Sequence, residues 1–207
     1  MVKKEHFERR YEEGNIPWEI NRPDRNLIEI VSSIPIKAGK CLDIGCGTGD
    51  NTIWLSRQGF EVIGCDVSRL AVDSAVDKAS VAGVTCSFVN CDFLQDEIEG
   101  APFSFLFDRG CFHSFSDPAK QQAFAHRAAD LLEQKGIWLS LIGNSDEVRR
   151  EEQKGPPQHT ALEIVKAVEV YFEILMLRSG YFDSNRKPSP RNWICLNQKR
   201  ERLSVGC

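Results

Sequence analysis

The stretch CLDIGCGTGDNT, residues 41–52, has the spacing of a ligand-binding turn. Between an apolar run and the polar start of a helix it places three glycines at alternate positions: Gly45, Gly47 and Gly49. Glycine lets the main chain approach a ligand where any Cβ would collide, and the following helix presents free N–H groups. Acidic residues stand before and at the end of the turn, at Asp43 and Asp50. Two carboxylates beside the turn favour a ligand with a cationic part.

A nicotinamide dinucleotide is the first alternative ligand for such a turn. Its G-x-G-x-x-G motif, counted from Gly45, requires a third glycine at position 50. This chain has Asp50 there. The carboxylate would repel a pyrophosphate, which argues against a nicotinamide oxidoreductase.

The rest of the chain predicts the elements that position the turn. Helices are expected near 3–13 and 24–32, and an N-cap at Asp117-Pro118 and a capping box over Thr160–Glu163 mark two later helix starts. Apolar runs near 40–44, 61–65, 86–90, 103–107 and 136–142 alternate with helix-like stretches near 51–58, 68–81 and 118–133. Two more strands are expected near 171–178 and 192–197. This order predicts a single α/β domain with a doubly wound, mostly parallel, seven-stranded sheet.

The charge and composition of the chain limit the kinds of binding partner that we expect. The 207 residues carry a formal charge of -4 with both signs interspersed, so neither nucleic acid nor a membrane is expected as a partner. The charged N-terminus has no apolar segment of the kind that a signal peptide needs, which favours a cytoplasmic location. The eight cysteines show no C-x-x-C spacing. Reduced thiols are therefore expected, with no metal site.

The glycine turn also carries a family resemblance. LDIGCGTG resembles the first motif of class I S-adenosylmethionine-dependent methyltransferases, D-x-G-x-G-x-G. Asp66, at the end of the second expected strand, would by this resemblance accept from both ribose hydroxyls. Asp92, after the third, would accept from the adenine amino group, with Phe93 beside the ring. The resemblance implies S-adenosylmethionine as cofactor, a Rossmann-like fold and these further cofactor-binding residues: Trp18, Cys46, Thr48, Val67 and Asp108.

Other segments concern the methyl acceptor. The [N/D]-P-P-[Y/F] sequence of amide and base methyltransferases is absent after the fourth expected strand, where the chain reads Asp108-Arg109-Gly110. That segment and RYEEGNIPWEINRP resemble thiopurine methyltransferase and tellurite-resistance-type small-molecule methyltransferases. The resemblance implies that residues 1–35 form a helical lid on a core of 36–207, and that Tyr11 and Trp18 close the site. Alternatively, both aromatics are core residues.

The expected reaction is methyl transfer to a small molecule through sulfur, another chalcogen or oxygen, by a monomer. An acceptor that is already ionised needs no base, whereas a hydroxyl does, and His113 is the first candidate because its loop follows the fourth strand. Arg109 would hold an anionic acceptor, or else pair with Asp108 or another nearby acid. Tyr11 is the third candidate catalytic residue.

Two other functions remain open from the sequence. Four cysteines fall at the expected carboxyl ends of four strands, where soft thiolates suit arsenite: Cys46, Cys65, Cys91 and Cys111. The alternative is that they are small buried apolar residues. A non-catalytic domain that binds S-adenosylmethionine as a sensor or as a partner subunit is the other possibility.

Overall fold

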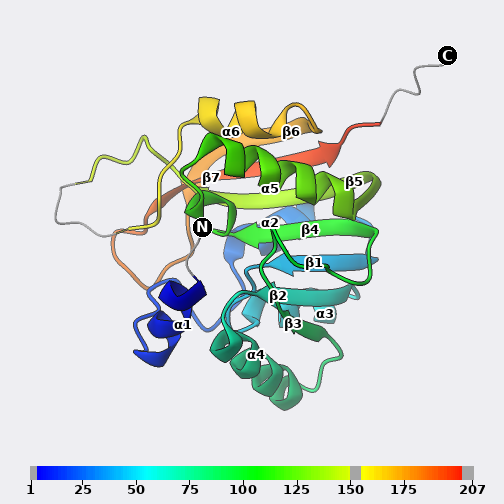
Figure 1. Ribbon diagram of the computed structural model, residues 1–207, viewed down its shortest axis with the longest axis vertical. Helices are drawn as coiled ribbons and strands as arrows, with labels where there is room; N and C mark the ends of the chain where they lie inside the picture. The colour runs from blue at the N-terminus through cyan, green and yellow to red at the C-terminus, as the bar shows by residue number, and fades with distance from the viewer. Residues whose placement is uncertain (1–3, 150–154, 202–207) are drawn as a thin grey trace.

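A seven-stranded sheet forms the centre of the protein in the computed structural model, which describes residues 4–149 and 155–201 (Figure 1). Its strand order is β3-β2-β1-β4-β5-β7-β6. The strands are β1 Lys40–Ile44, β2 Glu61–Asp66, β3 Ser87–Asn90, β4 Phe103–Arg109, β5 Leu132–Gly143, β6 Phe172–Tyr181 and β7 Arg191–Lys199. All neighbours pair in parallel except β7, which is antiparallel to β5 and to β6. The predicted mostly parallel α/β sheet is confirmed.

Helices cover both faces of this sheet (Figure 1). They are α1 Lys4–Glu12, α2 Arg25–Ser33, α3 Asp50–Arg57, α4 Arg69–Ala82, α5 Pro118–Leu131 and α6 Ala161–Val168, with a short 3₁₀ turn at Phe112–Ser114. Because side chains alternate along a strand, β1 and β4 feed two separate apolar clusters. Leu42 and Leu106 pack with α5 and α6, whereas Cys41 and Phe105 pack with α2 and α3.

The predicted helix starts are present in atomic detail. Asp117 caps α5 with Pro118 in its first turn, and Thr160 and Glu163 form the reciprocal capping box of α6. Asp24 caps α2 by accepting from the Asn26 N–H. These local signals are short-range hydrogen bonds, which explains why the sequence alone reveals them.

The junction of α5 and β5 differs from the prediction. The helix expected to residue 133 ends at Leu131, and the strand begins at once with Leu132 instead of near 136. Leu132 pairs with Phe103, and the register then shifts before Phe105 pairs with Ile137. Lys135, with φ +60°, lies in this irregular stretch. A bulge thus extends the strand through polar residues that carry no alternating apolar pattern.

The N-terminal helix lies apart from the sheet. α1 stands beside α4, at the carboxyl ends of the parallel strands (Figure 1). Of the connection between β5 and α6, residues 144–149 and 155–160 belong to the described part of the chain, and Asn144 and His159 form a bridge just beyond the carboxyl end of β5. Within the described residues, no helix has the length and apolarity to cross a membrane.

Candidate active site

The turn between β1 and α3 brings the main chain close to the N-terminal segment. Gly47 has φ +55°, and a Cβ at this position would lie 3.1 Å from the Tyr11 Oη atom. Tyr11 Oη in turn accepts a hydrogen bond from Trp18 Nε1 at 3.2 Å. The two aromatic side chains therefore lie over the glycine turn, which favours the interpretation that they close a site over the alternative that they fill the core.

The other two glycines of the turn serve internal packing. A Cβ on Gly45 would lie 3.1 Å from the Cys111 Cβ, and one on Gly49 would lie 2.9 Å from the Ala75 Cβ. Both have positive φ, +68° and +88°. Gly45 nevertheless lines the same hollow as Trp18 and Gly47, and the expected contact of all three glycines with a ligand stays a prediction.

Asp66 stands at the end of β2, next to Gly47. Its Oδ2 accepts from the Gly47 N–H at 3.0 Å and its Oδ1 from the Ser68 N–H at 2.9 Å. Burial raises the pKa of Asp66 to about 6, although these N–H donors favour the charged form. Each oxygen keeps a second lone pair, so the expected contact with ribose hydroxyls is compatible with this geometry. Val67 follows it, and its carbonyl accepts from Asn90 Nδ2.

Asp43 and Asp108 lie deeper than a cofactor contact requires. Asp43 is 1% exposed and accepts from the Thr52 hydroxyl at 2.7 Å, and burial raises its pKa to about 7. Asp108, 0% exposed, accepts from the Cys111 and Phe112 N–H groups and from the indole of Trp138. Both carboxylates accept hydrogen bonds from the segments that surround the site and so stabilise them. Their expected direct contact with the cofactor stays a prediction.

The two residues after β3 that are expected to contact adenine differ in their exposure to solvent. Phe93 is 6% exposed and packs against Phe124 with ring centroids 4.5 Å apart, so it is part of the apolar core, and its expected place beside the adenine ring stays a prediction. Asp92 is half-buried, and its oxygens accept from the Leu94 N–H and from Gln95 Nε2. It caps a local turn, and a second acceptor direction on each oxygen remains for an amino group.

Arg109 ties three segments together. Its Nε donates to Asp24 Oδ2 at 2.6 Å, Nη1 to the Trp18 carbonyl at 3.0 Å and Nη2 to the Asp183 carbonyl at 2.6 Å. Of the two roles expected for Arg109, pairing with a nearby acid is the one present, and the acid is Asp24 rather than Asp108. Residues 182–190 connect β6 to β7, and Arg109 joins this connection to the N-terminal segment.

His113 is anchored to the protein interior. It is 8% exposed, and its Nδ1 accepts from the Gly143 N–H at 3.0 Å, which leaves the ring proton on Nε2. Burial lowers the pKa of His113 to about 3, so the ring is neutral at pH 7. Since its basic nitrogen is already occupied, this geometry favours a structural role over the expected role of a base.

A charged cluster beside the turn contains two residues that the sequence analysis missed, Glu19 and Lys78. Lys78 Nζ on α4 lies 2.9 Å from Asp50 Oδ2 and 2.6 Å from Thr48 Oγ1. The Thr48 hydroxyl also donates to Glu19 Oε2. Burial raises the pKa of Asp50 and so does Glu19 beside it, whereas hydrogen bonds lower that of Glu19. No sequence motif marks Glu19 or Lys78.

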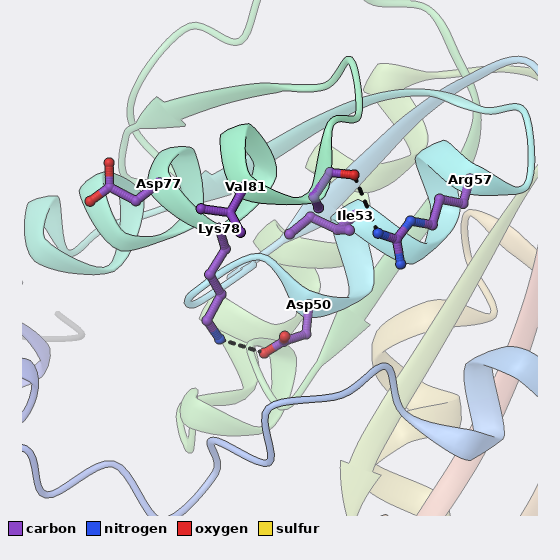
Figure 2. Close-up of a pocket in the computed structure, with 7 residues that line it drawn as sticks. Asp50, Ile53, Arg57, Asp77, Lys78 and Val81 are labelled. Carbon is purple, nitrogen blue, oxygen red and sulfur yellow. Dashed lines mark hydrogen bonds and ion pairs between the residues drawn. The ribbon is translucent and has the colours of Figure 1, made fainter.

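Two hollows flank this cluster. A small cavity of about 50 Å³ lies under the N-terminal segment, and its lining includes Trp18, Glu19, Gly47 and Thr48. The predicted cofactor residues Cys46 and Asp50 also line it. A wider groove of about 430 Å³ runs outside, between α3 and α4, where Figure 2 shows the Lys78 side chain pointing to Asp50. Asp50 lines both hollows, and Lys78 lines the groove.

The four cysteines do gather near the turn. Cys65 lies in β2 and Cys91 directly follows β3, and Cys46 and Cys111 lie where a Cβ on Gly64 or Gly45 would meet them. Cys46, Cys65 and Cys91 are each 6% exposed or less. Burial raises the pKa of Cys46 and Cys111, which keeps these thiols protonated. Within residues 4–149 and 155–201, no group of three or more His, Cys, Asp or Glu side chains is arranged to hold a metal ion.

Comparisons with known proteins define the class. Residues 41–136 match the family described as "Methyltransferase domain". The chain is 28% identical over 158 residues to a probable thiol methyltransferase 2 of Arabidopsis thaliana, covering 75% of this chain and 67% of that protein. It is 26% identical over 141 residues to thiocyanate methyltransferase 1 of Brassica oleracea, covering 66% of this chain and 60% of that one.

The fold comparison agrees with the sequence matches. The structure of 1,6-didemethyltoxoflavin-N1-methyltransferase from Burkholderia thailandensis, solved with S-adenosylhomocysteine, superposes with a TM-score of 0.76 at 21% identity, covering 97% of this chain and 88% of that one. The chain is an S-adenosylmethionine-dependent methyltransferase. The predicted class, fold and cofactor are therefore confirmed.

The residues of the site fit this cofactor. A Cβ would fill the close approach at Gly47, where the main chain meets the covering segment. The raised pKa values of Asp43 and Asp66 reflect carboxylates whose charge is costly in this interior. A cationic sulfonium nearby would stabilise those charges, because an opposite charge favours the ionised carboxylate.

Proposed function

We propose that the protein transfers the methyl group of S-adenosylmethionine to the sulfur of a small-molecule thiol or related sulfur anion. The observation that carries this proposal is the state of His113, whose basic nitrogen accepts from a backbone N–H and whose ring is neutral. A hydroxyl acceptor needs a base, whereas a thiol ionises near neutral pH and its thiolate is the nucleophile. The thiol and thiocyanate methyltransferases among the sequence relatives support the same acceptor class.

The roles of the site residues follow from their places. S-adenosylmethionine supplies a methyl carbon bonded to a cationic sulfur. The turn at Gly47 and the carboxylate of Asp66 would hold it, while Tyr11 and Trp18 cover it and exclude water. The chemistry that it would supply is an in-line displacement, in which the acceptor sulfur would form a new S–C bond as the sulfonium C–S bond breaks and a neutral thioether leaves. Orientation is then the chain's main contribution to the rate.

Thiophenol and phenol form a matched pair of acceptors for the test. Purified protein is incubated with S-adenosylmethionine and each acceptor at pH 7.0, and S-adenosylhomocysteine is measured. We expect thiophenol to react at least about a hundredfold faster, because the phenol lacks the contribution of a general base. Equal rates would contradict the proposal.

The same assay distinguishes the other functions. Arsenite as acceptor tests whether the cysteines near the turn hold a metalloid. Binding of S-adenosylhomocysteine without turnover on any of these acceptors would favour a non-catalytic sensor or subunit. The monomeric state and the division into a lid of residues 1–35 and a core of 36–207 stay predictions, which light scattering and limited proteolysis test.

A further inference from the structure

Lys78 joins the N-terminal segment to the turn that is proposed to hold the cofactor. From α4, its Nζ contacts Asn21 Oδ1 at 3.2 Å and lies 3.7 Å from Glu19 Oε1, both in the N-terminal segment. On the other side it contacts Thr48 and Asp50. One ammonium therefore connects the segment, the turn and the start of α3, and Figure 2 shows it reaching from α4 to Asp50.

Lys78 is the positive charge that balances the two carboxylates of the cluster, Glu19 and Asp50. Glu19 and Asp50 face each other across Thr48, with side chains only 13% and 20% exposed. Two carboxylates this close repel each other when both are ionised. The Lys78 ammonium, 32% exposed, supplies the compensating charge and donates to groups on both sides.

The cavity beneath the segment is too small for the cofactor as it stands. It measures about 50 Å³, and Trp18, Glu19 and Ile20 form its roof. Sites for ligands of this size have volumes of roughly 300–1,000 Å³. Entry of S-adenosylmethionine therefore requires the roof to move away from the turn, and the contacts of Lys78 with Glu19 and Asn21 lie where the two would separate.

We propose that Lys78 is a positioning residue that holds the N-terminal segment closed over the glycine turn and sets the rate at which the cofactor site opens. The inference rests on the proposed function for the identity of the ligand, but the closure itself is a property of the ligand-free protein. Arg109 holds the same segment from the other side through the Trp18 carbonyl and Asp24. Loss of Lys78 therefore loosens residues 18–22 without releasing the segment entirely.

The test compares wild type with Lys78→Met, and with Arg69→Met as the matched control. Arg69 is on the same helix, with its side chain 69% exposed and paired with Asp73. Hydrogen exchange of the ligand-free proteins is measured at residues 18–22. We expect about tenfold faster exchange in Lys78→Met, equivalent to about 1.4 kcal/mol, and no change in Arg69→Met. Lys78→Arg, which keeps the charge, should restore most of the protection.

Stopped-flow binding of S-adenosylhomocysteine, followed by tryptophan fluorescence, gives the second readout. Lys78→Met should increase both the association and the dissociation rate several-fold. If Lys78→Met folds poorly, Glu19→Ala removes the side chain of the segment that pairs with Lys78 and accepts from Thr48, and it should give the same changes. Wild-type exchange and wild-type binding rates in these variants would overturn the proposal. Faster exchange in a protein that does not bind S-adenosylhomocysteine would instead refute the proposed function and leave the closure standing.

Discussion

The Gly143 N–H donates to His113 Nδ1 at 3.0 Å, so the histidine that follows β4 is bonded to the end of β5. A Cβ on Gly110 would lie 2.8 Å from the other ring nitrogen, Nε2, so the main chain also covers that side. The ring is buried between two strands and acts as a connection between them.

His113→Gln tests this role against that of a base. A glutamine can keep an acceptor for the Gly143 N–H, and we expect the ratio of thiophenol to phenol rates to stay unchanged. The free energy of unfolding at pH 7 should fall by about 1–2 kcal/mol from altered packing. A selective loss of phenol methylation would instead identify His113 as a base.

The pH dependence of stability gives an independent check on His113. Its folded pKa of about 3 lies below the ordinary value of 6.5, so the unfolded chain binds the proton more tightly. The contribution of His113 to stability is complete above pH 6.5 and is lost as the pH falls toward 3. Urea unfolding at pH 7.5 and 5.0 should therefore show a smaller loss in His113→Gln than in wild type, and identical losses would contradict the buried neutral ring.

Gly47→Ala should weaken cofactor binding through contact with Tyr11. The new Cβ would lie 3.1 Å from Tyr11 Oη at a backbone φ of +55°. Gly83→Ala is the matched control, because Gly83 has φ +63° with no other atom within 4 Å of the new Cβ. Both variants should lose about 1 kcal/mol of stability from backbone strain. In calorimetric titration, only Gly47→Ala should lose affinity for S-adenosylhomocysteine, and equal affinities would place the ligand away from this turn.

Asp66→Ala should weaken the binding of S-adenosylhomocysteine by about 1.5–3 kcal/mol, the range for hydrogen bonds to a charged group. The same change frees the Gly47 and Ser68 N–H groups, so the turn loses support as well. Asp73→Ala, on α4, serves as the comparison, since the Asp73 side chain is 54% exposed and pairs with Arg69 at the surface. Unchanged affinity in Asp66→Ala would refute the ribose contact.

The sequence was sufficient for the fold because its signals are local. Apolar runs, glycines and caps each depend on residues within a few positions, and the β1–α3 turn, Asp66 and both capping motifs stand where they were expected. The bulge before Gly136 was missed because residues 133–135 are polar and carry no strand pattern.

The sequence predicts the site less completely, because the site depends on the direction of side chains and on contacts between residues that are far apart in the sequence. Asp43, Asp108 and Phe93 follow strands at positions where cofactor contacts are expected, and the structure shows that all three side chains are buried. Lys78 meets Glu19 across 59 positions of sequence, with no pattern that links them. Side-chain direction at a strand end depends on the twist and register of the sheet, which a single sequence does not fix.

Arg109→Met should destabilise the protein strongly, because it leaves a buried carboxylate without its partner. Asp24 is 0% exposed, and Arg109 Nε donates to it at 2.6 Å. Breaking such a pair costs roughly 3–5 kcal/mol, whereas Arg178→Met, which removes an exposed pair with Glu29, should cost less than about 1 kcal/mol. Urea unfolding measures both. Adding Asp24→Asn to Arg109→Met should recover part of the loss, and the absence of any recovery would contradict the charge explanation.

Asp43 offers a prediction of opposite sign to that for His113. Burial raises its pKa from 3.8 to about 7, so the folded protein binds this proton more tightly than the unfolded chain does. The free energy of unfolding therefore loses the contribution of Asp43 as the pH rises from about 4 to about 7. In Asp43→Asn this loss is absent, so the variant should gain on the order of 2 kcal/mol relative to wild type between pH 5.0 and 8.0.

The comparison for Asp43 is Asp73→Asn, whose side chain is 54% exposed and pairs with Arg69, and which should show no such gain. Unfolding is measured in the ligand-free protein, so that no cofactor charge alters the titration. A difference between Asp43→Asn and wild type that does not change with pH would mean that Asp43 is already ionised at pH 5. The interior below the glycine turn would then favour a carboxylate charge without any bound cation, and the electrostatic reason for a sulfonium ligand at this site would be lost.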